Sequence, residues 1–315
     1  MAKIPLSAVS RTQGNNEAVK NGTVTPKGFE FDFTEVPILV QAFRRMVRGL
    51  EFDVCEMAIT TYICAKSYGK AFTALPVFLV RGFHHEAILY NTKSAVRTPK
   101  DLEGGRVGVN RGYTVTTGVW ARGIMQDEYG VDLSKVTWVL SGDEHVAEYK
   151  APSNVISMEP GNTLEDMLIA GDLDAVIGVE VTHPDIAPLI PNPTETAFEA
   201  LRERGLYPVN HLIVIKDELL EKYPDLAADV FDTFARSKKL YVEKLRTGEL
   251  EKPNATDLMY LRVMNVTGSD PLPYGINTNR ATIEKLLDHA MTQSIINQRP
   301  AVESLFAPST RDLDA

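Results

Sequence analysis

Short apolar runs and amphipathic segments alternate along this chain, and that alternation constrains its fold more than any other feature. Residues 52–57 (FDVCEM), 72–80 (FTALPVFLV) and 211–215 (HLIVI) are typical of buried strands. Between such runs lie segments of helical period, for example the one opened by Pro37, a residue favoured in the first turn of a helix. Strands that alternate with helices are typical of α/β proteins. We therefore expect an α/β fold.

The length of the chain indicates more than one lobe. A chain of 315 residues is longer than a domain with one small hydrophobic core. Residues 92–105 and the segment 184–208, which carries five prolines, are expected to cross between lobes. Lobe one would then hold residues 1–91 and 208–315, with the C-terminal helices, and lobe two residues 92–207. This layout resembles the type-2 periplasmic-binding-protein fold, in which a ligand binds in the cleft between lobes.

Charge and cysteine content narrow the class of protein. A net charge of −9 makes a nucleic-acid partner unexpected. The start MAKIPLSAVSRTQGNNE lacks the apolar core of a signal peptide, and no stretch approaches the roughly 20 apolar residues of a membrane span. Cys55 and Cys64 lie nine residues apart in a strand–helix segment, so we expect no disulfide. These features predict a cytoplasmic protein that binds no membrane.

Polar residues follow several of the predicted strands. Ligands of such α/β folds bind outside the carboxyl ends of strands, so these residues are expected to line a ligand site. The candidate segments are Arg11 to Asn15, Glu56 to Thr60, Arg81 to His85, Arg111 to Thr117, Glu180 to His183, and Asn210 with His211.

Several longer blocks resemble one known family. Residues 51–78 (EFDVCEMAITTYICAKSYGKAFTALPVF) are similar to a stretch of 4,5-dihydroxyphthalate decarboxylases. RGFHHEAILYN, PKDLEGGRVGV, GYTVTTGVWARGIMQDEYGV, YPVNHLIVI and DPLPYGINTNR resemble further blocks in the same order. The resemblance runs from about Val36 to Arg280. The chain differs from the family pattern at two places. His84 stands where the family usually has an arginine, and Ser10-Arg11 stands where it has a YD-type pair. Both differences affect the expected substrate more than the expected fold.

The resemblance implies an enzyme of aromatic-compound catabolism such as phthalate degradation. The expected reaction is cofactor-independent decarboxylation of a hydroxylated aromatic carboxylic acid, with a proton delivered to the ring carbon that loses carbon dioxide. His85 occupies the family's histidine position and is the predicted proton donor, with His211 as the second candidate. The structural alternative for His85 is a bond to a backbone carbonyl. Neighbours on a strand point to opposite faces, so His84 either supports His85 or faces solvent.

Glu56 follows an apolar strand, where an unpaired carboxylate is costly. It would pair with Arg81, orient a catalytic histidine, or form a plain structural ion pair. We include it among the catalytic candidates.

Two arginines and one helix start are the expected carboxylate-binding groups. A guanidinium offers paired donors that match a carboxylate, as Arg81 and Arg111 would. The helix predicted to begin near Thr114 offers backbone N–H groups to an anion, although Thr114 would serve equally as an N-cap. His183, which precedes a proline, is a loop residue or a reserve contact. The predicted substrate-binding residues are Arg81, His84, Arg111, Gly112, Tyr113, Thr114, Thr116, Thr117 and His183.

No cofactor or metal is expected. Glu56, His85, His183 and His211 are of types that bind divalent ions, but none shows the close spacing of a dedicated site such as H-x-x-x-H. The glycines near 104–108 bracket a predicted strand instead of following it, so they indicate no nucleotide.

Two hypotheses remain open. The first is the decarboxylase, with a small aromatic carboxylate as its ligand and homo-oligomerisation undecided. The alternative is a solute-binding protein that holds a small anionic or aromatic carboxylate without catalysis, since one fold serves many functions.

Overall fold

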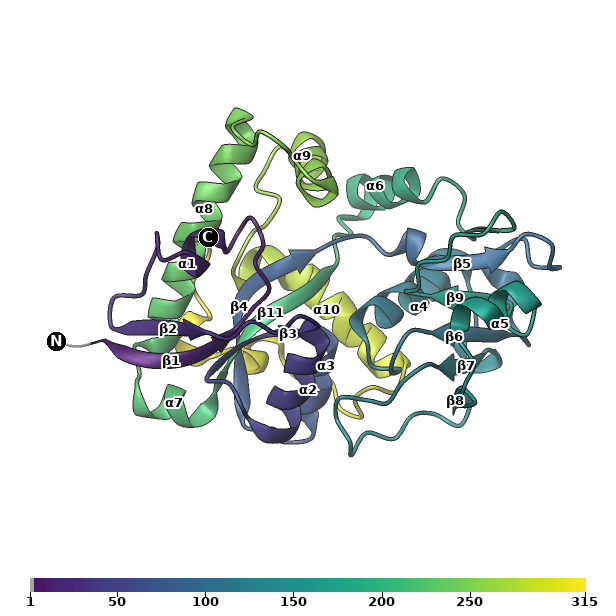
Figure 1. The fold of residues 1–315 in the computed structure, drawn as a ribbon, viewed down its shortest axis with the longest axis horizontal. Coiled ribbons are helices and arrows are strands. Elements are labelled where there is room, and N and C mark those ends of the chain that lie inside the picture. Colours follow the sequence, from purple (N-terminus) through teal and green to yellow (C-terminus); the bar gives the residue numbers. More distant parts are fainter. Residues whose placement is uncertain (1–2) are drawn as a thin grey trace. The chain divides into compact units, whose positions relative to one another are not determined.

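The structure is a computed structural model that describes residues 3–315. The Met1-Ala2 start, on which the cytoplasmic prediction partly depends, lies outside the described residues. The chain divides into two compact units (Figure 1). Unit one comprises the chain up to Arg81, Val209–Glu284 and Pro300–Ala315. Unit two comprises Gly82–Pro208 and Lys285–Arg299.

Unit one is built on a five-stranded sheet. Its strand order is β2-β1-β3-β11-β4. Strand β1 runs parallel to both β2 and β3, whereas β11 is antiparallel to its neighbours β3 and β4. All five residues of β3 are buried, which explains why its sequence is a continuous apolar run interrupted only by Glu56. The strands are β1 (Ile4–Val9), β2 (Phe29–Phe33), β3 (Val54–Ala58), β4 (Phe72–Arg81) and β11 (Val209–Lys216).

Helices of unit one follow the sequence pattern closely. In α2 the buried residues Ala42, Phe43, Met46 and Val47 form the predicted apolar stripe. The helix begins at Leu39, two residues after the predicted opening at Pro37. The helices are α1 (Glu17–Lys20), α2 (Leu39–Gly49), α3 (Ile59–Ser67), α7 (Asp217–Lys222), α8 (Leu226–Thr247) and α9 (Ala255–Thr267), with α10 (Ile276–Thr292) shared between the units; two short 3₁₀ turns, Val302–Leu305 and Pro308–Thr310, follow.

Unit two contains a six-stranded sheet of order β10-β5-β9-β6-β7-β8. Strand β6 is parallel to β7 and β9, and β7 is parallel to β8. Strand β5 is antiparallel to β9 and β10. The strands are β5 (Ile88–Asn91), β6 (Arg106–Val109), β7 (Thr137–Leu140), β8 (Val155–Ser157), β9 (Ala175–Ile177) and β10 (Ile186–Pro188).

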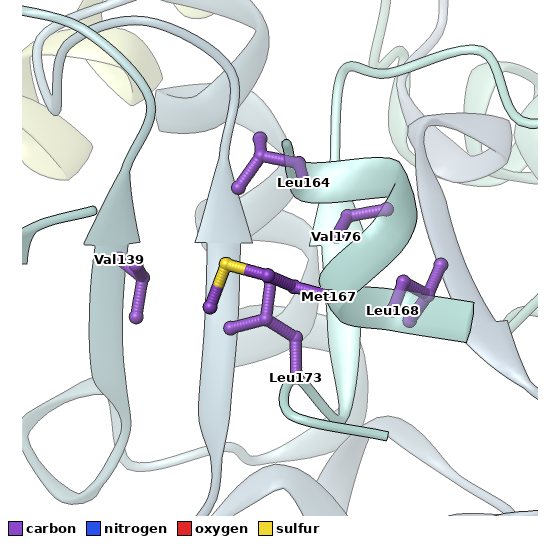
Figure 2. Close-up of a cluster of buried hydrophobic side chains, with 6 residues drawn as sticks. All are labelled: Val139, Leu164, Met167, Leu168, Leu173 and Val176. Carbon is purple, nitrogen blue, oxygen red and sulfur yellow. The ribbon is translucent and has the colours of Figure 1, made fainter. Parts of the chain in front are cut away.

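Helix α5 packs against this sheet. Leu164, Met167 and Leu168 of α5 pack with Leu173, Val139 of β7 and Val176 of β9 in one buried apolar cluster (Figure 2). Gly108 of β6 makes room for this packing, because a Cβ there would lie 2.8 Å from the side chains of Leu164 and Leu173. The helices are α4 (Thr116–Tyr129), α5 (Leu164–Ala170) and α6 (Pro193–Arg204), with 3₁₀ turns at His85–Ala87, Pro99–Leu102 and Leu133–Lys135.

The unit boundaries differ from the predicted lobe boundaries. The first lies at Arg81–Gly82, ten residues before residue 91, because β5 pairs with β9 and β10 of the second sheet. Lys285–Arg299, predicted in lobe one, belongs to unit two. The second boundary, Pro208–Val209, lies within one residue of the predicted one.

The proline-rich segment also differs from the prediction. Residues 184–208 were expected to form a plain connection, but they contain β10 and the twelve-residue helix α6. Pro193 is the first residue of that helix, where its missing N–H costs nothing.

Candidate active site

Glu56 and His211 are brought together by two neighbouring strands of unit one. Residue Glu56 of β3 lies opposite Ile213 of β11, and His211 lies opposite Ala58. Because side chains alternate along a strand, Glu56 and His211 project from the same face as diagonal neighbours. The His211 Nδ1 atom lies 2.7 Å from Glu56 Oε1. The structure therefore pairs Glu56 with a histidine.

The Glu56 carboxylate is fully buried and held by several donors. Its Oε2 accepts a hydrogen bond from the backbone N–H of Arg11 at 3.0 Å. Its Oε1 is 3.4 Å from the side-chain amide nitrogen of Gln13. Both donors lie in the segment that follows β1. A buried carboxylate requires such partners. They fix Glu56 in position, with one of its oxygens against the ring of His211.

His211 is oriented on a second side by an aromatic ring. The Phe43 ring of α2 meets the imidazole edge-to-face, with ring centroids 5.2 Å apart and an interplanar angle of 88°. The His211 side chain remains 19% exposed, whereas that of Glu56 is 0% exposed. With Nδ1 directed at Glu56, exchange of a proton with a ligand falls to Nε2. This is the arrangement of a histidine oriented by a carboxylate, a recurring element of general acid–base catalysis.

Arg81 lies at the end of β4 and is buried. Its Nη1 donates to Asn279 Oδ1 at 2.6 Å. The Asn279 amide nitrogen in turn donates to the carbonyls of Pro273 and Gly275, at 3.0 and 2.8 Å. Tyr260, whose pKa is raised to about 12 mainly by burial, contacts the Arg81 backbone. The structure therefore places this predicted carboxylate clamp among internal contacts of unit one.

His84 and His85 both belong to unit two and are both buried. His84 immediately precedes the 3₁₀ turn that begins at His85. The Nε2 atom of His85 lies 3.2 Å from a carboxylate oxygen of Glu128, on α4. Glu128 also accepts a hydrogen bond from Arg204 of α6 at 2.6 Å. His85 thus joins an internal ion-pair cluster, and its buried Nδ1 has no hydrogen-bond partner in the structure. His211 is the more exposed of the two candidate proton donors.

The turn at the predicted helix start binds an anion, as expected of its donors. The anion is a side-chain carboxylate of this same chain, that of Glu144. Helix α4 begins at Thr116, and the backbone N–H groups of Tyr113 and Thr114 precede it. Both donate to the carboxylate of Glu144, the second at 3.2 Å, and the Thr114 hydroxyl donates to Glu144 Oε2 at 2.6 Å. The glycine at 112 lets the carboxylate approach this closely, because a Cβ there would lie 2.5 Å from Glu144 Oε2. We call these three donors the Thr114 turn.

The other predicted residues of this segment have different surroundings. Arg111 has a left-handed backbone with φ of 68°, and its N–H donates to the Ser141 hydroxyl at 2.8 Å. Burial lowers the pKa of its half-buried guanidinium, and its Nε has no partner in the structure. Thr116 is buried, and Thr117 is half-buried beside Gly178. Arg111 is accordingly the carboxylate-binding candidate of unit two.

His183 lies in the loop between β9 and β10. Its Nδ1 accepts a hydrogen bond from the backbone N–H of Asp185 at 3.2 Å, and its side chain is 31% exposed. These contacts are those of a turn residue.

Two residues that sequence reasoning missed stand beside the Thr114 turn. Glu144 lies in the irregular segment after β7, where no periodicity marks it. Arg122 of α4 is fully buried, within residues 118–125, all of which are buried. Its place in this otherwise uncharged run of the sequence is the one signal that was available.

No group of three or more histidine, cysteine or acidic residues suited to a metal ion occurs within residues 3–315. Cys55 and Cys64 are both buried and free. Among the same described residues, no helix has the length and apolar character needed to cross a membrane.

Comparisons with known sequences give two similar relatives. The chain is 27% identical over 287 residues to a 4,5-dihydroxyphthalate decarboxylase of Comamonas testosteroni, covering 86% of each chain. It is 32% identical over 176 residues to a 4,5-dihydroxyphthalate decarboxylase of Pseudomonas putida, covering 51% of this chain and 68% of the relative. No family model matches the chain.

Solved structures share the fold at much lower identity. The desulfurization enzyme DSZB has a TM-score of 0.55 at 12% identity, covering 98% of each chain. A putative periplasmic sulfonate-binding protein from Methylobacillus flagellatus has a TM-score of 0.54 at 11% identity, covering 98% of this chain and 92% of its own. The aliphatic sulphonate-binding protein of Escherichia coli has a TM-score of 0.52 at 13% identity, with 96% and 91% covered. The fold is therefore the two-lobed α/β fold of periplasmic binding proteins, as predicted.

Proposed function

This chain belongs to the 4,5-dihydroxyphthalate decarboxylase family, and we propose that it decarboxylates a hydroxylated aromatic carboxylic acid. The observation that carries the proposal is the Glu56–His211 pair of unit one, a partly exposed imidazole held at 2.7 Å by a buried carboxylate. The proposed activity is that of a carboxy-lyase whose own side chains carry out the reaction.

The proposed chemistry needs one proton. A hydroxyl ortho or para to the reacting carbon pushes electrons into the ring, and the His211 imidazolium delivers its Nε2 proton to that carbon. The bond to the carboxylate then breaks, its electron pair returns to the ring, and carbon dioxide leaves. The net change replaces a carboxylate by a hydrogen and consumes one proton, which solvent returns to His211.

Glu56 has a defined part in this proposal. Its carboxylate accepts a hydrogen bond from His211 Nδ1 and fixes the ring, so that Nε2 is the nitrogen left for the ligand. Arg11 and Gln13 hold the carboxylate from the other side and prevent it from turning away. Arg111 of unit two, whose Nε has no partner in the structure, is proposed separately as a group that binds a carboxylate.

The test incubates the purified protein with 4,5-dihydroxyphthalate and a panel of mono- and dihydroxybenzoates. Carbon dioxide release and the ultraviolet spectrum are followed together, with and without a chelator. We expect release from at least one compound, unaffected by the chelator and lost in His211→Asn. His183→Asn, a substitution in a turn of unit two, is the matched control and should retain release.

The competing function is ligand binding without catalysis. It is favoured by the fold that this chain shares with the sulfonate-binding proteins. In that case a compound of the panel would raise the melting temperature, but no carbon dioxide would be released by the wild-type protein. That outcome would refute the decarboxylase proposal.

A further inference from the structure

The loop between β1 and α1 carries the donors that hold Glu56. It comprises residues 10–16, and we call it the Glu56 loop. The Arg11 N–H and the Gln13 side-chain amide reach the two oxygens of the carboxylate, at 3.0 and 3.4 Å. Neither residue belongs to a helix or a strand, so regular secondary structure does not fix their positions. Other contacts must therefore hold the loop in shape.

Asn16, the last residue of the loop, contacts both of these residues. It is fully buried. Its Oδ1 accepts a hydrogen bond from the backbone N–H of Gln13 at 2.7 Å, and its Nδ2 donates to the Arg11 carbonyl at 2.9 Å. The same Nδ2 donates to the Ser10 hydroxyl at 2.6 Å. One side chain thus binds the backbone of both residues that hold Glu56.

The ordinary role of an asparagine at this place is to cap the helix that follows. Asn16 is the N-cap residue of α1, and asparagine is favoured there because its side-chain oxygen accepts from N–H groups of the first turn. The Asn16 side chain makes no such bond in this structure. It turns back into the loop instead, so its hydrogen bonds stabilise the loop and not the helix.

The Glu56 loop is also confined from the side of α8. A Cβ at Gly14 would overlap the Tyr241 ring, so the loop backbone packs directly against that ring. The ring is buried, and its hydroxyl donates to the Asp257 carboxylate of α9. Because the ring is held at its far end, movement of the loop toward α8 is blocked. The loop is therefore fixed from inside by Asn16 and from outside by Tyr241.

We propose that Asn16 is a positioning residue for the Glu56–His211 pair. By fixing Arg11 and Gln13, it keeps the Glu56 carboxylate against the imidazole. The inference rests on the proposed function for the catalytic role of the pair, whereas all the contacts that carry it lie within unit one. A carboxylate that drifts leaves the ring free to turn and to exchange its two tautomers. Displacing a catalytic group by about 1 Å can lower a rate by about 10²-fold.

Asn91 of unit two provides a matched control. It is buried, and its Nδ2 donates to the carbonyls of Leu168 and Ile169, each at 3.3 Å. Its Oδ1 accepts from the Lys93 N–H at 3.0 Å. These are the kinds of bond that Asn16 makes, so Asn91→Ala removes the same bonds from the other unit.

The experiment records the ring nitrogen resonances of the histidines by NMR on the full-length protein in mildly alkaline buffer, with His211 assigned from the spectrum of His211→Asn. In the wild type we expect the signals of one tautomer, protonated at Nδ1. In Asn16→Ala they should move toward the average of the two tautomers, whereas Asn91→Ala should leave them in place. Turnover of carbon dioxide release should fall at least about tenfold in Asn16→Ala, with KM little changed, and should be retained per folded molecule in Asn91→Ala.

Unchanged His211 signals in a folded Asn16→Ala protein would overturn the proposal. An equal movement in Asn91→Ala would overturn it too, because loss of any buried asparagine would then have the same effect. If Asn16→Ala does not fold, Asn16→Asp takes its place, since it keeps the Oδ1 acceptor and loses both donated bonds; failure of both to fold would overturn the proposal equally. The spectrum needs no turnover, so a wild-type protein that releases no carbon dioxide would refute the proposed function and leave the positioning of the pair to be decided by NMR.

Discussion

Two histidine–glutamate pairs, one in each unit, use the same chemistry in different surroundings. His211 and Glu56 of unit one are 2.7 Å apart, and the imidazole keeps 19% of its surface exposed. His85 and Glu128 of unit two are 3.2 Å apart, and the imidazole side chain is 1% exposed. Glu128 is shared with Arg204, whereas Glu56 is held by neutral donors. The two pairs therefore differ in the exposure of the imidazole more than in their chemistry, and exposure is the reason that His211 is the proposed proton donor.

Matched substitutions of the two histidines give the largest expected difference. His211→Asn should lower the turnover of carbon dioxide release by about 10²–10⁴-fold, because asparagine keeps a hydrogen-bond donor but carries no transferable proton. His85→Asn should leave turnover per folded molecule unchanged. The comparison is made with the best substrate of the panel at saturation. The opposite pattern, loss in His85→Asn alone, would restore His85 as the proton donor.

Replacing the two glutamates sharpens the comparison further. Glu56→Gln should lower turnover by about tenfold or more, because an amide holds the His211 ring in its orientation less firmly than a carboxylate does. Glu128→Gln is the control, and its turnover should match that of the wild type. An equal loss of turnover in both variants would refute a specific role for Glu56.

The pair in unit two should show its effect in stability instead. Glu128→Gln removes the charge that holds both His85 and Arg204, so we expect the free energy of unfolding to fall by about 1–3 kcal/mol. Chemical denaturation at neutral pH measures this loss. A variant as stable as the wild type would show that the cluster contributes nothing net, as many ion pairs do.

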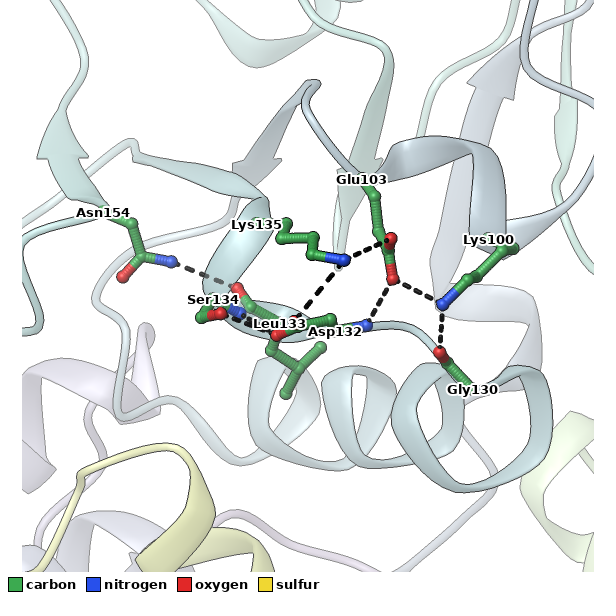
Figure 3. Close-up of polar contacts among 8 residues, drawn as sticks. All are labelled: Lys100, Glu103, Gly130, Asp132, Leu133, Ser134, Lys135 and Asn154. Atoms are coloured by element: carbon green, nitrogen blue, oxygen red, sulfur yellow. Dashed lines mark hydrogen bonds and ion pairs between the residues drawn. The ribbon is translucent and has the colours of Figure 1, made fainter.

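The smallest effect is expected at a carboxylate near the surface of unit two. Glu103 accepts from Lys100 and from the Asp132 N–H and pairs with Lys135 (Figure 3). These contacts, the Lys100 bond first, lower its pKa from 4.5 to about 2. A lowered pKa means that the folded state binds the proton less tightly than the unfolded state.

The stabilisation by ionised Glu103 is therefore complete above pH 4.5 and is lost as the pH falls through about 2. Glu103→Gln should lower the urea midpoint slightly at neutral pH, and the difference from the wild type should vanish near pH 2. Glu159→Gln, at an exposed position, serves as the control. A difference between wild type and Glu103→Gln that does not change with pH would contradict the assignment.

The alternation of apolar and amphipathic segments predicted most of the fold, because strand and helix periods are local properties of the chain. The three-residue strands β8 and β10 were missed, since they are too short to show a period. Helix α6 was not predicted, because its segment contains several prolines. Its first residue, Pro193, nevertheless occupies a position where proline favours a helix start.

The site was predictable only in part. Glu56 and His211 were both candidates, but their contact joins residues 155 positions apart and depends on the pairing of β3 with β11. The helix start near Thr114 was predicted from its hydroxyls and glycine. The carboxylate bound there belongs to Glu144, which lies in a segment without periodicity between β7 and β8. Glu144 could not be identified, because nothing in the local sequence distinguishes it from the other acidic residues.

The return of the C-terminal segment to unit two has a consequence for biosynthesis. Gln293, in the segment Lys285–Arg299, supplies the acceptor for the buried Arg122 Nε. Phe306, in the last stretch, packs on Phe78 of unit one. A nascent chain that has emerged only as far as residue 280 thus lacks a piece of each unit. Neither unit completes its interior until residues 285–315 have emerged, so truncations that remove these residues should damage both units.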